Sequence, residues 1–179
     1  IEKMEVYEGQ KIDLDLDVVR GDVFVNMPNN PIQRWIGYAI PELLADISKQ
    51  WIFPYGKHSV ADNQVISPDT IILNFTERYR NDRINYFFLK EYESKCLFIG
   101  TEREWKLFAE KWDMPNLQRA EVHDFLSAAR ILQQSKFFMG NQSMMYNIAE
   151  AIKHPRILEL CNFAPNCFVT GDNAYEFFH

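Results

Sequence analysis

The residues of this sequence that are best suited to bind a ligand lie in three short polar turns. The best defined turn consists of Gly140, Asn141, Gln142 and Ser143. Ser143 is a good N-cap for a following helix, but the N3 position holds Tyr146, so no capping box is expected. Backbone amides at a helix start attract anions, because they lie at the positive end of the helix dipole. The turn therefore predicts a phosphate site.

A second turn, residues 76–83, is rich in arginine. Arg78 and Arg80 lie there, close to Asn74 and Thr76. Arginine carries a planar fork of donors that suits a diphosphate, so we expect this turn to supply the counter-charge of a phosphate site. Acidic residues in the same turn leave a second interpretation open, namely a charged loop in solvent.

The third turn begins at Gly100 and Thr101. Thr101 has Glu104 at N3, and this pair predicts a capping box at the start of a helix. Gly140 of the first turn has two interpretations, which the sequence leaves open. It either lets the turn approach a ligand closely or relieves a tight connection between a strand and a helix.

Apolar runs and helical patterns alternate from residue 69 onward, and these elements must position the three turns. Strands are expected at residues 70–75, 95–99, 117–121, 136–139 and 156–160. Helices are expected at residues 84–92, 101–112, 122–135, 143–153 and 172–179. This alternation predicts an α/β fold with a Rossmann-like, doubly wound parallel sheet. Turns that leave the carboxyl ends of parallel strands reach the same edge, so the three turns are expected to converge.

The helical patterns also predict which side chains are buried. One apolar face is expected to contain Phe125, Ala128, Ala129 and Leu132, and another to contain Met144, Ile148, Ala151 and Ile152. Glu150 interrupts the second of these apolar segments. We expect its carboxylate to face either a ribose hydroxyl or solvent.

Residues 1–64 differ from the rest and are expected to form a partial N-terminal region with a linker, followed by one ligand-binding domain at residues 65–179. Residues 11–19 alternate apolar residues with Asp13, Asp15 and Asp17, as in a half-exposed strand. The aspartates suggest either a metal site or the wet face of an edge strand; without accompanying His or Glu we expect no metal. Because the first residue is Ile1, we expect the chain to belong to a longer protein.

The composition excludes several classes of function. The chain has 179 residues, with 19 basic and 25 acidic side chains and a net charge of -6, which argues against a general nucleic-acid surface. Its three cysteines lack zinc-ligand spacing, so we expect a reducing, cytoplasmic compartment and no structural metal. No apolar run approaches the roughly 20 residues of a membrane span. Motifs for covalent catalysis, the P-loop and the GxGxxG fingerprint are missing, so no catalytic residue is identified.

The segments ILNFTERYRND, CLFIGTEREW and SKFFMGNQSMMYNIAEAIKHPRILELC resemble the C-terminal half of GT-B glycosyltransferases of family 9, the heptosyltransferase-like proteins. The resemblance covers about residues 65–179, and FFMGNQS followed by IAEAIKHPRILE is its most specific part. It implies a transferase that moves a sugar from a nucleotide-diphosphate donor to a glycan or lipid-linked acceptor. It also implies that the reaction needs no metal and no cofactor.

The resemblance assigns the donor site to the three turns. The expected donor and phosphate contacts are Asn74, Thr76, Arg78, Arg80, Gly100, Thr101, Gly140, Asn141, Gln142 and Ser143. Glu150 is expected to bind the ribose, and its spacing from Gln142 is that of the paired acids in many retaining GT-B enzymes. Gln142 and Ser143 stand where heptosyltransferases carry an Asp–Thr pair, and a neutral glutamine cannot contribute the charge of an aspartate.

Two other functions remain as alternatives. The first is a non-catalytic nucleotide- or glycan-binding module of the same fold, and the second, less favoured, is a nucleotide-sugar epimerase. The glycine-rich loop that commonly supplies the base in inverting GT-B enzymes does not occur in this sequence. We therefore expect transfer by this chain alone to be weak or absent.

Overall fold

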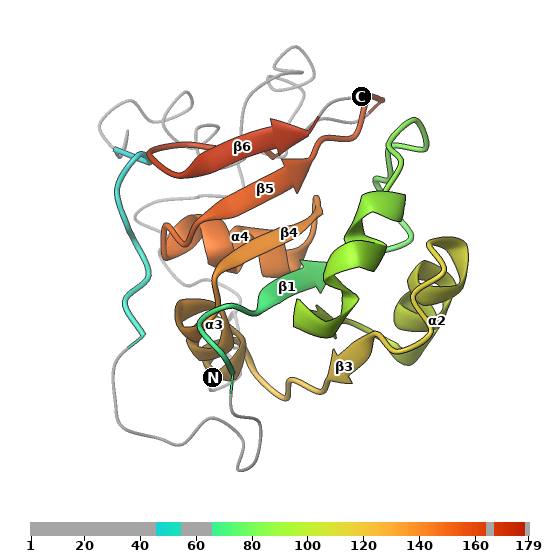
Figure 1. The fold of residues 1–179 in the computed structure, drawn as a ribbon. Coiled ribbons are helices and arrows are strands. Elements are labelled where there is room, and N and C mark those ends of the chain that lie inside the picture. The colour runs from blue at the N-terminus through green and yellow to red at the C-terminus, as the bar shows by residue number, and fades with distance from the viewer. Residues whose placement is uncertain (1–45, 55–65, 164–166, 178–179) are drawn as a thin grey trace, which may run out of the picture.

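The computed structural model describes residues 46–54, 66–163 and 167–177, which Figure 1 draws as a coloured ribbon. Six parallel strands form one sheet in the order β3-β2-β1-β4-β5-β6. The strands are β1 (Ile71–Asn74), β2 (Cys96–Ile99), β3 (Gln118–Ala120), β4 (Phe137–Asn141), β5 (Arg156–Glu159) and β6 (Ala174–Phe177). The expected Rossmann-like parallel α/β fold is therefore confirmed. The aspartates of residues 11–19 lie outside the described residues.

Helices cover both faces of this sheet. The helices are η4 (Phe87–Lys95, a 3-10 helix), α2 (Glu102–Lys111), α3 (Phe125–Gln134) and α4 (Met144–Ala151). Strand residues alternate between two cores, since Ile72 packs with α3 and α4, whereas Ile71 and Leu73 pack with η4 and α2. The inner strands β1, β2, β4 and β5 are thus buried on both faces, which explains their apolar runs in the sequence, whereas the edge strands β3 and β6 are partly exposed.

The strand order contains one switch point. The chain runs outward from β1 through β2 to β3, and it then returns to place β4 on the other side of β1. Asn74, the last residue of β1, pairs in register with Gly140 of β4. In an open sheet of this kind, the crevice at the carboxyl ends of the two strands that flank the switch point is where ligands commonly bind.

Two expectations about local structure are wrong. Residues 172–179 were expected to begin a helix, but Ala174–Phe177 form β6, which pairs with the free edge of β5. In place of the helix expected at residues 84–92, the structure has the 3-10 helix η4, which begins three residues further along the chain. Tyr86, the residue directly before η4, is buried in the core. In both places, tertiary contacts outweigh a weak local preference.

The described residues before the sheet lie against its helices. The backbone amides of Trp51 and Ile52 donate to the carbonyl of Ala151 at 3.0 and 3.2 Å, and the Lys153 ammonium donates to the carbonyl of Ile47. Trp51 and Ile52 therefore satisfy a carbonyl at the end of α4 that has no partner within the helix. The expected boundary between residues 64 and 65 stays a prediction.

Candidate functional site

The three polar turns lie at one edge of the sheet, because each follows a parallel strand. Residues 75 and beyond follow β1, Gly100 follows β2, and Gln142 follows β4. Glycine at two of these points is required by packing within the protein. A Cβ atom on Gly140 would lie 2.2 Å from the carbonyl oxygen of Asn74, and one on Gly100 would lie 2.7 Å from the ring of Phe98.

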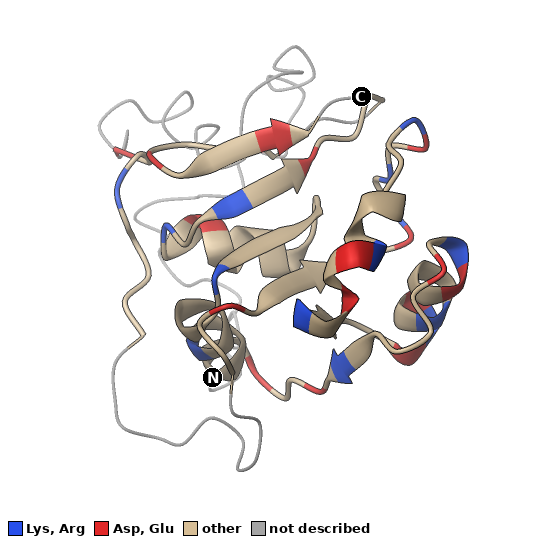
Figure 2. Ribbon diagram, viewed as in Figure 1, with Lys and Arg blue, Asp and Glu red and all other residues tan. Residues whose placement is uncertain are grey.

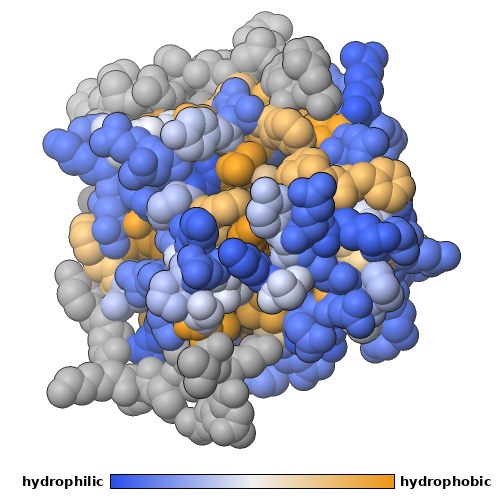
Figure 3. All heavy atoms as spheres, viewed as in Figure 1, coloured by the Kyte–Doolittle hydropathy of each residue, from blue (hydrophilic) through white to orange (hydrophobic). Residues whose placement is uncertain are grey.

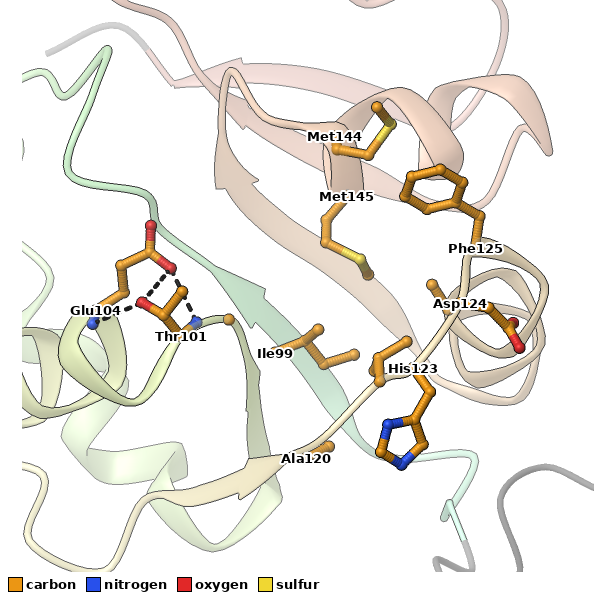
Figure 4. Close-up of a pocket in the computed structure, with 12 residues that line it drawn as sticks. Ile99, Thr101, Glu104, Ala120, His123, Asp124, Phe125, Met144 and Met145 are labelled. Carbon is orange, nitrogen blue, oxygen red and sulfur yellow. Dashed lines mark hydrogen bonds between the residues drawn. The ribbon is translucent and has the colours of Figure 1, made fainter. Parts of the chain in front are cut away.

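A pocket of about 390 Å³ opens at the carboxyl ends of β2 and β3, and we call it the rim pocket. Figure 4 shows Thr101 and Glu104 on one side of this pocket and Phe125, Met144 and Met145 on the other. The starts of α2, α3 and α4 therefore meet around one cavity. Its walls are mainly apolar, as in most small-molecule sites.

Phe125 and Met144 are not core residues, contrary to expectation. Their exposed fractions are 62% and 56%, and both line the rim pocket. Each is the first residue of its helix, directly after the N-cap. A side chain there lies beyond the end of the sheet, so helical spacing alone misplaces it. An apolar residue directly after an N-cap is the sequence signal that marks these two pocket residues.

Two helices at the rim pocket, α2 and α4, have the N-caps expected from the sequence, and α3 is capped by Asp124, which was not predicted. Thr101 and Glu104 form the predicted capping box of α2. Ser143 Oγ accepts from the amide of Tyr146 at 3.1 Å, and α4 has no capping box. The start of α4 thus retains the positive dipole end that favours anions.

The two arginines line a different pocket. Arg78 and Arg80, with Tyr79 and Phe163, surround a cavity of about 410 Å³ that shares no lining residue with the rim pocket. The structure therefore does not bring the arginines and Gly100 into one cavity, although both cavities open at the same edge of the sheet. Asn141 is the last residue of β4, and its side chain hydrogen-bonds to the backbone of Thr76 and Arg78. It thereby fixes residues 76–83, which we call the arginine turn, to the end of β4.

Arg78 and Arg80 have different surroundings. Arg80 Nε lies 2.9 Å from Glu159 Oε1, and its guanidinium stacks over the ring of Phe75 at 4.9 Å. Arg78 is exposed and makes no ion pair within residues 66–163 or the other described ranges; its guanidinium lies 5.8 Å from the ring of Tyr79. Of the two, only Arg78 has a guanidinium that is free to meet a ligand.

Gln142 and Asn74 are mostly engaged within the protein. Gln142 Oε1 accepts from the amide of Cys161 at 2.9 Å, which joins the ends of β4 and β5. Asn74 Nδ2 donates to the carbonyl of Ile99 at 2.6 Å, and Thr76 Oγ1 lies 3.1 Å from the carbonyl of Arg78. These contacts fix the edge of the sheet at the switch point.

Glu150 lies in the last turn of α4 and is buried, with an exposed fraction of 3%. Its carboxylate receives hydrogen bonds from Lys153, Thr170 and Arg156, the last at 2.5 Å. Burial opposes ionisation, but these donors outweigh it and hold the pKa of Glu150 below its usual value. The carboxylate does not face solvent, and a ribose would have to displace one of these donors to reach it.

The face of the molecule seen in Figures 2 and 3 carries both charged and apolar residues. Figure 2 shows acidic and basic residues interspersed along the ribbon, and Figure 3 shows a largely hydrophilic surface with small apolar groups. Exposed aromatic residues include Phe87 and Phe88 of η4. Within the described part of the chain, no helix is long and apolar enough to cross a membrane.

Comparison with protein-family models, with curated proteins and with solved structures finds no match to this chain. The resemblance to GT-B glycosyltransferases therefore stays a prediction from the sequence. The structure establishes a Rossmann-like α/β domain with a parallel sheet, whose carboxyl edge carries a pocket next to the switch point.

Proposed function

We propose that this domain binds a nucleotide-diphosphate sugar at the carboxyl edge of the sheet and forms the donor-binding half of a metal-independent glycosyltransferase. One observation carries the proposal. The rim pocket lies at the carboxyl ends of parallel strands, beside the switch point and at the start of α4. Ligands of open α/β sheets commonly bind at this position, with phosphates at a helix start.

The chemistry of the edge suits the parts of such a donor. The apolar side chains of Phe125, Met144 and Met145 match the flat face of a nucleobase. The diphosphate lies between this pocket and the arginine turn, where the start of α4 and the guanidinium of Arg78 supply positive charge. These groups then stabilise the diphosphate as it leaves, so the reaction needs no Mg²⁺.

The acceptor and the compartment are further parts of the proposal. We place a glycan or lipid-linked acceptor on residues outside the sheet domain, and no catalytic base is assigned. Cys96, Cys161 and Cys167 are buried free thiols, which is the state that a reducing cytoplasm maintains.

A non-catalytic binding module is the second candidate. The observation that favours it is the engagement of two buried carboxylates, Glu150 and Glu159, in structural contacts. Glu159 binds Arg80 and Tyr86, and Glu150 lies in a buried cluster. Neither is free to act as a general base. Turnover of a donor separates the two candidates, because a module binds nucleotides without consuming them.

A thermal-shift titration tests the proposal. Nucleoside diphosphates and their sugar conjugates should stabilise the protein, by about 2.7 kcal/mol at 100 times the dissociation constant. Met144→Ala should reduce this effect because Met144 lines the rim pocket, whereas Leu107→Ala, an exposed apolar residue outside it, should not. No stabilisation by any nucleotide would contradict the proposal.

A further inference from the structure

The second pocket at the carboxyl edge combines aromatic rings with charged groups, and we call it the arginine pocket. Its volume is about 410 Å³, and it is lined by Glu77, Arg78, Tyr79, Arg80, Asp82 and Phe163. The two aromatic residues are accessible, since Tyr79 is only half-buried and Phe163 is 74% exposed. A cavity with such walls suits a ligand that has both an apolar face and polar substituents.

Tyr79 has a backbone conformation that is unfavourable for an aromatic residue. Its φ is 56°, in the left-handed region that favours glycine and asparagine. Such conformations persist where the surrounding structure imposes them, and they cluster at binding sites. Here Asn141 Nδ2 donates to the carbonyl of Arg78, directly before Tyr79, at 2.6 Å. Glycine would adopt this conformation more readily, so the choice of tyrosine indicates that the ring itself has a use.

The backbone on the other side of Tyr79 is fixed as well. The amide of Asn81 and Nε of Arg80 donate to Glu159 Oε1 at 2.6 and 2.9 Å. Glu159 has an exposed fraction of 0%. Buried partners therefore hold the turn at both ends, and a ligand that binds there orders little additional backbone.

Two side chains of opposite charge at this pocket have no ion-pair partner. The guanidinium of Arg78 and the carboxylate of Asp82 form no ion pair within residues 46–54, 66–163 and 167–177. In contrast, Glu77 Oε1 lies 2.7 Å from Arg103 Nε. A guanidinium only donates and a carboxylate only accepts, so the pocket offers both kinds of hydrogen bond that hydroxyl groups make. A sugar ring has hydroxyl groups together with an apolar face.

The position of the arginine pocket fits the far end of a nucleotide-diphosphate sugar. The rim pocket lies at the ends of β2 and β3, whereas the arginine pocket lies beside the segments that follow β1 and β5. Neighbouring strands lie 4.7–4.9 Å apart, so two to three strand spacings, or about 12 Å, separate the two pockets along the edge. An extended nucleotide-diphosphate sugar can span this distance. A phosphate by itself fits the arginine pocket poorly, because the carboxylates of Glu77 and Asp82 repel it.

We propose that the arginine pocket binds the sugar ring of the donor. The rings of Tyr79 and Phe163 contact its apolar face, and the carboxylate of Asp82 accepts hydrogen bonds from its hydroxyls. The inference rests on the proposed function for the identity of the donor. It adds a subsite that selects the sugar, next to the diphosphate that Arg78 binds.

Matched pairs of ligands isolate the contribution of the sugar. The probes are UDP with UDP-glucose, ADP with ADP-glucose and GDP with GDP-mannose, and calorimetry gives the affinity ratio within each pair. Tyr79→Gly should weaken binding of the sugar conjugate about 10-fold and leave the nucleoside diphosphate unchanged, because only the conjugate loses a ring contact. Glycine adopts the backbone of Tyr79 without strain, so an unfolding curve should show that the variant still folds. Tyr92→Ala is the control, since Tyr92 is exposed in η4 outside the pocket.

A second variant tests the carboxylate. Asp82→Asn should weaken binding of the sugar conjugate about 10-fold, because a charged acceptor becomes neutral, and it should not weaken binding of the nucleoside diphosphate. Asp69→Asn is the matched control, since Asp69 is exposed and lies outside the arginine pocket, before β1.

The outcomes separate this inference from the proposed function. Nucleotide binding with an unchanged affinity ratio in both Tyr79→Gly and Asp82→Asn overturns the inference and leaves the proposed function intact. Equal losses for conjugate and nucleoside diphosphate would place the nucleotide itself in this pocket, which also overturns it. Methyl glucoside is the probe for a free sugar, and its binding beside UDP, if lost in Tyr79→Gly, would assign the pocket to an acceptor instead. Failure of every nucleotide and conjugate to bind overturns both proposals.

Discussion

The backbone amide of Thr76 donates a hydrogen bond of 2.9 Å to Asn141 Oδ1, which joins the turn after β1 to the end of β4. The same side chain uses Nδ2 to donate to the carbonyls of Thr76 and Arg78 at 3.0 and 2.6 Å. Asn141 is fully buried. The side-chain amide of Asn141 therefore links the ends of β1 and β4 at the switch point, and it fixes the backbone of Arg78.

Asn141→Leu should destabilise the fold strongly. The change keeps a similar volume but leaves one amide and two carbonyls of the arginine turn without their partner. The free energy of unfolding, measured in urea, should therefore fall by about 3 kcal/mol. Asn147→Leu is the control, since among the described residues the side chain of Asn147 makes one hydrogen bond, to the carbonyl of Ser143. Equal losses in the two variants would show that Asn141 has no special role at the switch point.

Arg78 and Arg80 should respond in opposite ways to substitution. Arg78→Ala should leave the stability of the free protein nearly unchanged and weaken binding of nucleoside diphosphates by about 1.5 to 3 kcal/mol, with or without EDTA. Arg80→Ala should cost about 3 kcal/mol of stability, because Glu159 is buried and loses its cation. Calorimetric titration and urea unfolding measure the two effects. Unchanged nucleotide affinity in Arg78→Ala would favour the interpretation of its turn as a solvated loop.

Local signals account for the parts of the fold that the sequence predicted. The unit from β4 to β5 was predicted because Ser143 caps α4 and an apolar run lies on each side, and Thr101 with Glu104 marks the start of α2 in the same way. The strand β6 was missed because Ala174–Phe177 become a strand only through pairing with β5.

The candidate site was less predictable, because its chemistry depends on contacts between distant segments. The sequence places Arg78 and Arg80 two residues apart, yet one pairs with Glu159 and the other does not. The sequence likewise gives no sign that Asn74 lies beside Gly100. The residue types in the sequence were enough to identify the edge of the sheet as the candidate site. The partner of each side chain could be identified only from the fold.

Ser143→Ala should lower the stability of the free protein by about 1 kcal/mol, the usual effect of losing an N-cap. Ser143 Oγ accepts from the amide of Tyr146, and alanine cannot replace this bond. Ser94→Ala is the matched control, because Ser94 is exposed in η4. Nucleotide affinity should fall less than in Arg78→Ala. A Ser143→Ala protein as stable as the control variant would mean that the cap contributes little.

His154 should make stability depend on pH between neutrality and about pH 4. Burial lowers the pKa of His154 from 6.5 to about 4, and the charge of Arg156 adds to the shift; Nε2 lies 3.1 Å from Ser135 Oγ. The unfolded chain binds a proton at the ordinary pKa, whereas the folded protein resists it. The contribution of His154 is therefore complete above about pH 6.5 and is lost as pH falls through the folded pKa.

Urea unfolding at pH 7.5 and pH 5.0 measures this contribution. The native protein should lose about 2 kcal/mol over this interval through His154, from 1.36 kcal/mol for each unit between the ordinary pKa and pH 5.0. His154→Gln should remove that part of the pH dependence, because glutamine does not titrate. His123→Gln should retain it, since His123 is exposed at the rim pocket. If His154→Gln and His123→Gln lose the same stability between the two pH values, the buried imidazole is not the group that titrates.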